Sequence, residues 1–176
     1  MRRWWMRTVS GGIGLALVFM VAAVAQAQPN SATIQATANV LTPLSVTAGD
    51  NLAFGDVFPG VNASVAITDV GTAGSWSVAG VTLAEVTLSL ALPASLASGG
   101  NTMPIVFGAT DAGYSTSNDA TTASTFDPAA GATANLSGAA TGVLYVWIGG
   151  TVQPATNQTA GAYSAGITLT VDYTGL

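Results

Sequence analysis

The sequence predicts an all-β protein, and three observations carry this prediction. From about Ser31 onward, short runs of Val, Ile, Leu, Thr and Ala alternate between apolar and polar residues. Gly, Pro, Asn and Asp separate these runs, as they do where turns join short strands. No helical periodicity is sustained after residue 27. Many short strands joined by turns are typical of a β-sandwich or a β-barrel.

The N-terminal residues 1–27 have the features of a secretory signal peptide. A basic start is followed by an apolar run over residues 13–25, which ends in two overlapping Ala-x-Ala sites. Cleavage is expected after Ala25 or Ala27, and the run is shorter than the about 20 residues of a transmembrane helix. We therefore expect export to the cell surface or medium, no membrane insertion after cleavage, and one domain over residues 28–176. The basic residues of this leader are Arg2, Arg3 and Arg7.

Two runs alternate most clearly and should supply core faces. Residues 86–92 place Val or Leu at every second position, and residues 167–173 repeat the arrangement with Ile, Leu, Val and Tyr. Residues 143–148 are apolar on both faces, which favours a central strand. Further strands are expected at residues 32–41, 44–47, 52–54, 65–67, 76–78 and 103–107.

Residues 109–142 differ in composition from the rest of the chain. They are rich in Thr, Ser, Ala, Asn, Asp and Gly and contain few large apolar side chains. We expect a partly ordered polar insertion in the single domain, anchored by Phe126 and Leu136. Loops of this length are usually either functional or mobile, and composition does not decide between the two.

The charge pattern excludes several classes of partner. After the leader the chain carries eight acidic side chains and no basic one. Nucleic-acid binding relies on Lys and Arg to neutralise phosphates, and attraction to anionic membranes relies on the same side chains. We therefore expect neither partner. The chain also has no Cys, so its stability must come from apolar burial and backbone hydrogen bonds.

The missing side chains also argue against catalysis. Without His, Cys or Lys the chain cannot form a Ser-His-Asp triad, a Cys nucleophile, a Schiff base or the usual zinc sites. We expect no enzyme and no cofactor. A glycosidase needs only two opposed carboxylates, so this remains a distant alternative. Asp50 and Asp56 flank a turn signal, however, and such placement is typical of aspartates that bind turn amides.

Two weak binding signals remain. Asp111 and Asp119 bound the segment DAGYSTSND, whose oxygens suit calcium, but the spaced acidic ligands and closing Glu of a calcium loop are missing. A solvated loop is the stronger interpretation, so we expect no metal. Trp76 and Trp147 could form a platform for sugars, although both lie in apolar runs that favour the core.

A series of short motifs resembles a known family. The chain is similar in pattern to a family of secreted bacterial domains of unassigned function, related to spore coat protein U and to chaperone-usher pilins. The resemblance spans nearly the whole chain after the leader. It is carried by PLSV at 43–46, LAFG at 52–55, WSVAG at 76–80, LALP at 90–93, GGTV at 149–152, GAY at 161–163 and VDY at 171–173.

This resemblance implies an immunoglobulin-like antiparallel β-sandwich with an acceptor groove. In pilins a C-terminal strand, bounded by a Gly and a Tyr, lines a groove that an extension of the next subunit fills as a donated strand. A donated strand pairs with open backbone edges while its alternate side chains fill pockets. The implied acceptor residues are Gly161, Ile167, Leu169, Val171 and Tyr173.

The implied donor is the alternating segment at the start of the domain. Its apolar positions are Ala32, Ile34, Ala36, Ala38 and Val40. Two features depart from the pilin pattern. The chain lacks the cysteines that join the first two strands of pilins, and residues 32–41 could instead form the domain's own first strand.

The leading hypothesis is therefore a structural subunit of a cell-surface fibre or coat. Its partners would be further copies of the chain, joined through strand edges as a homo-oligomer or homopolymer, with a periplasmic chaperone as a candidate helper. The alternative is a secreted glycan-binding module or adhesin that uses Trp76, Trp147 or residues 109–142. An enzyme with two carboxylates ranks third.

Overall fold

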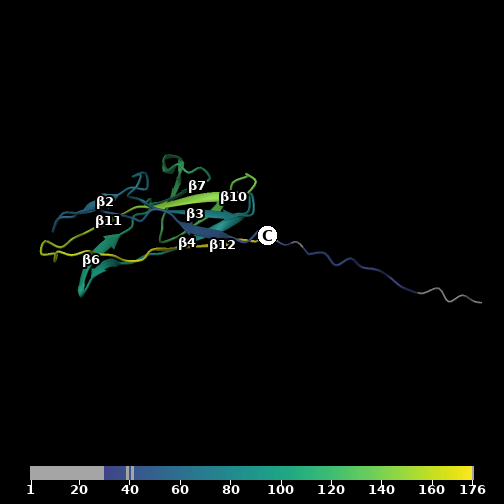
Figure 1. Cartoon of the computed structure of the whole chain (residues 1–176), viewed down its shortest axis with the longest axis horizontal. Coiled ribbons are helices and arrows are strands. Elements are labelled where there is room, and N and C mark those ends of the chain that lie inside the picture. The colour runs from purple at the N-terminus through teal and green to yellow at the C-terminus, as the bar shows by residue number, and fades with distance from the viewer. Residues whose placement is uncertain (1–29, 39, 41, 176) are drawn as a thin grey trace, which may run out of the picture. The chain divides into compact units, whose positions relative to one another are not determined.

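The computed structural model describes residues 30–38, 40 and 42–175, so the predicted signal peptide lies outside the described residues. Within them the domain contains strands and one short 3-10 helix (Figure 1). The elements are β1 Ser45–Ala48, β2 Ala63–Val65, β3 Gly74–Gly80, β4 Glu85–Ala91, β5 Ser95–Ser98, β6 Asn101–Val106, β7 Ala112–Ser115, η1 Ala120–Thr122, β8 Ser124–Phe126, β9 Ala132–Asn135, β10 Gly142–Ile148, β11 Gly150–Val152 and β12 Thr168–Tyr173.

The strands form three antiparallel sheets. The five-stranded sheet has the order β1-β3-β10-β7-β8, the four-stranded sheet β2-β11-β6-β5, and the three-stranded sheet β12-β4-β9. This arrangement confirms the predicted all-β class and is consistent with a β-sandwich. In the part of the chain that the structure describes, no helix is long and apolar enough to cross a membrane.

The main core lies between the five-stranded and three-stranded sheets, where β3 and β10 face β4 and β12 (Figure 1). Alternate residues of each strand point into it, because successive side chains of a strand face opposite sides of the sheet. The five-stranded sheet contributes Val78, Leu144 and Val146, and the facing sheet contributes Val86 and Leu88. These side chains are almost completely buried, so this part of the sandwich is closed.

The strongest sequence patterns give the strands that build this core. The alternating run at residues 86–92 becomes β4, and the run at 167–173 becomes β12. The run at 143–148, apolar on both faces, becomes β10, which lies between β3 and β7 in the middle of its sheet. The central position predicted for that run is therefore confirmed.

The segment expected as a polar insertion is more ordered than its composition predicts. Residues 109–142 contain β7, η1, β8 and β9, and these strands extend two of the sheets. Both expected anchors contact the main core: Leu136 is buried, and the ring of Phe126 packs beside that of Tyr114 at a centroid distance of 5.9 Å.

Two other expected strands are not formed. Residues 52–54 lie in an extended segment without strand pairing. The described residues of 32–41 also have no helix or strand, and their side chains are exposed. Residues 30–38 belong to a unit separate from the domain that begins after them. Strand alternation is therefore present in both segments without a partner strand to pair with.

A glycine pair moves the chain from one sheet to the next. The end of β10 belongs to the five-stranded sheet, whereas β11 starts only two residues later and pairs with β2 and β6. A side chain at Gly149 would collide with the backbone carbonyl of Val65, so only glycine fits this crossing. The crossing places a second apolar cluster against one face of the four-stranded sheet, apart from the main core.

Candidate functional site

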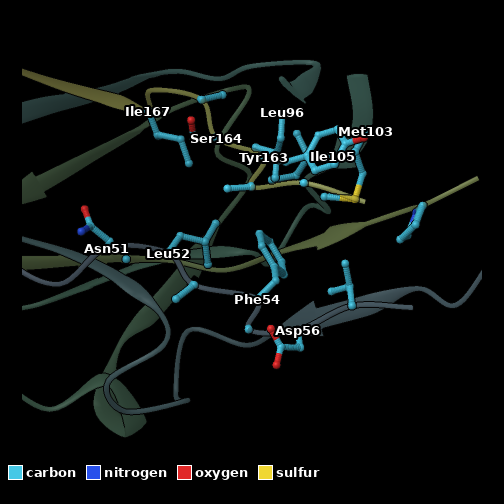
Figure 2. Close-up of a pocket in the computed structure, with 18 of the residues that line it drawn as sticks. Asn51, Leu52, Phe54, Asp56, Leu96, Met103, Ile105, Tyr163, Ser164 and Ile167 are labelled. Carbon is cyan, nitrogen blue, oxygen red and sulfur yellow. The ribbon is translucent and has the colours of Figure 1, made fainter. Parts of the chain in front are cut away.

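A groove of about 960 Å³ opens over the second apolar cluster. One wall is formed by residues 50–57 and the other by residues 158–167, while β5 and β6 supply the floor (Figure 2). Met103 and Ile105 are buried in this floor, and Leu96 is half-buried beside them. The cluster is therefore covered by one sheet from below and remains open between the two walls.

The first wall alternates like a strand over residues 52–54 and departs from that pattern at Gly55, whose φ of 65° lies in the left-handed region. Leu52 and Phe54 are half-buried and point into the groove, whereas Asp56 points away from it (Figure 2). Among residues 51–57, the backbone bonds within the described part of the chain are limited to one, from the N–H of Ala53 to Thr72 O at 2.8 Å. The wall therefore presents apolar side chains next to backbone groups that have no strand partner.

The second wall is fixed at a few points and is otherwise unpaired. Ser164 exchanges two backbone hydrogen bonds of 3.0 Å with Ala97 of β5, which forms an isolated bridge. The hydroxyl of Tyr163 donates to Thr159 O and accepts from Gln158 Nε2, both at 2.7 Å. These bonds hold residues 158–164 in place. The backbone between Ser164 and the start of β12 has no such bonds among the described residues.

The predicted acceptor residues are divided between two environments. Gly161 and Ile167 line the groove. Leu169 and Val171 are only 7% and 8% exposed, and they pack in the main core between the closed sheets. Tyr173 lies at the rim of that core, so the five residues do not form one continuous surface.

Tyr173 closes one end of the main core through its hydroxyl. This group donates to Thr42 O at 3.0 Å and accepts from the N–H of Val81 at 2.8 Å. The chain before β1 is thereby bound to the last strand, at the end of the domain opposite to β6 and β11 (Figure 1). The groove is lined by residues that precede β12, and it does not run along the inner face of that strand.

Sequence reasoning missed most of the groove-lining residues. A signal for the first wall was present, because the alternation over residues 52–54 predicted a strand face. Part of the floor was also predicted, because a strand was expected at residues 103–107. The sequence could not show that the first wall would be left half-buried, since that depends on how the two walls are placed.

The charges of the groove are few and of one sign. Asp50 and Asp56 are its charged lining residues. The predicted donor segment, residues 32–40, contains no charged residue. An uncharged strand could therefore enter the groove without burying an unpaired charge of its own.

The aspartates considered for calcium instead bind turn amides. Asp111 Oδ2 accepts from the N–H of Gly108 at 2.7 Å. Asp119 Oδ1 accepts from the hydroxyl and the N–H of Thr121 at 2.6 and 2.9 Å, and these bonds lower the pKa of the Asp119 carboxyl. In the described part of the chain, no three acidic, His or Cys side chains gather as a metal site would require.

The two tryptophans of the suggested sugar platform lie on opposite faces of the five-stranded sheet. Trp76 pairs with Val146 and faces the main core, whereas Trp147 pairs with Ser75 and faces outward. Because paired residues of antiparallel strands share a face, the two indoles cannot form one platform. Trp147 instead stacks beside Tyr145 on the outer face, at a centroid distance of 6.2 Å.

Comparison with known proteins gives a family for the chain and no activity. No match to a curated protein or to a solved structure was found. The model of a domain of unknown function, DUF4402, matches residues 44–173 and so includes every strand from β1 to β12. Because this match covers most of the sequence, the chain belongs to the DUF4402 family.

Proposed function

We propose that the protein is a non-catalytic structural subunit of a bacterial cell-surface fibre or coat, exported through its leader and assembled by strand donation between copies. One observation carries the proposal. An apolar cluster, open on one side, lies between residues 50–57 and 158–167, two backbone segments that line one groove and have no described strand between them. The pilin-like resemblance of the sequence supports the same assembly.

The groove has what a donated strand needs. Unpaired N–H and C=O groups on a sheet edge are satisfied when another chain adds a strand there. Leu52 and Phe54 on one wall and Ile167 on the other present apolar side chains toward the same space. A strand laid between them would pair with backbone on its two sides and cover the exposed parts of the half-buried Leu52 and Phe54.

Residues 32–40 of a second copy fit this role. Ala, Ile and Val alternate there with Thr, Gln and Asn, so one face can be buried while the other stays in water. Ile34 is 91% exposed and Val40 is 94% exposed, so both side chains offer apolar surface that a second copy could bury. Burying such a side chain contributes about 1.5–3 kcal/mol before the cost of ordering the segment.

Disulfide trapping between copies tests this assembly directly, because the native chain has no Cys. Copies carrying Ile34→Cys are mixed with copies carrying either Leu52→Cys or Ile167→Cys, and the mixture is oxidised. The second set carries a shorter affinity tag, so that mixed dimers can be told apart by size. We expect mixed disulfide dimers from Ile34→Cys. The matched control, Thr33→Cys, places its thiol on the opposite face of the donor and should give far fewer.

Substitutions at positions 33 and 34 also allow assembly to be measured directly. Ile34→Asp should leave the protein monomeric by size-exclusion chromatography with light scattering, because an unpaired carboxylate cannot enter an apolar groove. Thr33→Asp should still form filaments visible by negative-stain microscopy. Equal trapping from positions 33 and 34, or a wild-type protein that is strictly monomeric at the cell surface, would overturn the proposal.

A further inference from the structure

A second cavity lies on the outer face of the five-stranded sheet and is unrelated to strand donation. It measures about 490 Å³, within the range of small-molecule sites, which is about 300–1,000 Å³. Its floor is formed by Tyr145 and Trp147 of β10 with Ser77 of β3. Residues 67–71 form one wall, and residues 118–121, which include most of η1, form another.

The floor offers a rigid aromatic surface. Tyr145 and Trp147 are two residues apart on a central strand, and their rings are tilted by only 26° from parallel. Trp147 is 8% exposed and supports its neighbour from one side, whereas Tyr145 is half-buried and leaves part of its ring in the cavity. A flat ring held in this way can stack against the C–H groups of a sugar ring.

The walls add hydrogen-bond acceptors that are already fixed in position. Asp69 Oδ2 accepts from the N–H of Ala66 at 2.8 Å, and Asp119 Oδ1 accepts from Thr121. In each of these two carboxylates, the hydrogen bonds among the described residues use one oxygen only. The other oxygen of each carboxylate can therefore accept a hydrogen bond from a ligand hydroxyl. Because the turns hold both groups, little entropy is lost when they bind.

The chemistry of the lining selects one ligand class. All basic residues of the chain lie within the first seven positions, so the cavity has no cationic group for a phosphate, sulfate or uronate. No group of three ligating side chains is present among the described residues for a metal ion. A neutral, hydroxyl-rich ring satisfies both the aromatic floor and the acceptors on the walls.

We propose that this cavity binds a neutral saccharide, with a sugar ring stacked on Tyr145 and its hydroxyls donating to Asp69 and Asp119. The site lies on the face of the sheet opposite to the main core. It requires no second copy of the chain. A fibre built by strand donation would therefore present one such site on each subunit.

The test uses the exported full chain and an array of immobilised neutral hexasaccharides. Hexuronates, the corresponding anionic sugars, are immobilised on the same array for comparison. We expect retention on at least one neutral oligosaccharide, followed by titration of that sugar against tryptophan fluorescence. Tyr145→Leu keeps apolar bulk but removes the flat ring, and should weaken binding about tenfold. Asp119→Asn should weaken it by a similar factor of about ten, because a carboxylate accepts stronger hydrogen bonds.

Asp172→Asn is the matched control for charge. This residue is exposed on β12 in another sheet, so its substitution removes the same charge and should leave sugar binding unchanged. Circular dichroism of each variant reports whether it is folded, and Ile34→Asp should retain full sugar binding because it affects assembly alone. Retention of hexuronates only, no retention of any neutral sugar, or wild-type binding by both folded site variants would overturn the proposal.

Discussion

The main core and the groove cluster use the same kinds of side chain and differ in what covers them. In the main core, Leu144 and Val86 come from facing sheets and neither exposes any surface to water. In the groove cluster, Met103 and Ile105 have one sheet beneath them, but Leu52 above is only half-buried. The same alternation thus gives a sealed interior in one place and an open groove in the other.

This difference shows that alternation alone does not complete a sandwich. An apolar strand face is buried only where a second layer is present, and a strand is stable only where its backbone has a partner. The walls at residues 50–57 and 158–167 have suitable side chains without that partner. The comparison therefore predicts that the two regions respond differently to the same substitution.

The largest expected effect comes from truncating Leu side chains in the two regions. Leu144→Ala removes a fully buried side chain and leaves a cavity, which should lower the free energy of unfolding by about 2–5 kcal/mol. Leu52→Ala should cost about 1 kcal/mol in the monomer, because its side chain stays partly exposed to water and its removal leaves no closed cavity. Urea unfolding of both monomeric variants measures the difference.

Equal losses from the two substitutions would contradict this description of the groove. The donor-defective background Ile34→Asp keeps the measurement on monomers. The same Leu52→Ala substitution can also be measured in assembled protein, in a chain that keeps Ile34. Its cost should rise toward that of a core residue, because the donated strand would then cover the site.

How far the sequence predicts this fold depends on where each strand obtains its stability. β4, β10 and β12 carry strong alternating patterns and were predicted. β7 and β9 have the sequences AGYS and ATAN, which give no such signal. They become strands because they pair with β10 and β4, and strand preference depends largely on such neighbours.

The next largest effect concerns the sealed end of the main core. Tyr173→Phe keeps the ring and removes the hydroxyl that bonds Thr42 O and the N–H of Val81. Thr42 O is exposed and can bond water instead, but leaving the part-buried N–H of Val81 unpaired should cost about 1–3 kcal/mol in the free energy of unfolding. Tyr163→Phe serves as the comparison, because its hydroxyl bonds lie in the groove wall.

Hydrogen exchange separates the two tyrosine variants. Tyr173→Phe should increase exchange at Val81 and at the ends of β1 and β12, whereas Tyr163→Phe should loosen residues 158–164 and leave the main core unchanged. Exchange that rises across the whole domain in both variants would show that the groove wall and the core unfold together. The two regions would then not be independent.

The candidate groove could be predicted only in part, for a related reason. The pilin-like pattern pointed to the C-terminal segment, and Gly161 and Ile167 do line the cavity. Leu169 and Val171 continue the same alternation but lie between closed sheets. Alternation specifies which side chains share a face, and it does not specify where along a strand the cover ends.

The smallest expected effect is on pH dependence and involves a residue outside both apolar regions. Hydrogen bonds from Thr121 lower the pKa of Asp119 in the folded protein below its ordinary value of 3.8. The folded state therefore binds fewer protons than the unfolded state in this range, and the stabilisation is complete above pH 3.8. It is lost as the pH falls through the lowered folded-state pKa. Asp119→Asn should make the acid side of the stability curve shallower. Because Asp119 contacts neither apolar cluster, acid titration of this group should leave the difference between Leu144→Ala and Leu52→Ala unchanged. If that difference changed with protonation of Asp119, the turn would be coupled to the cores, and the comparison of two independently covered regions would fail.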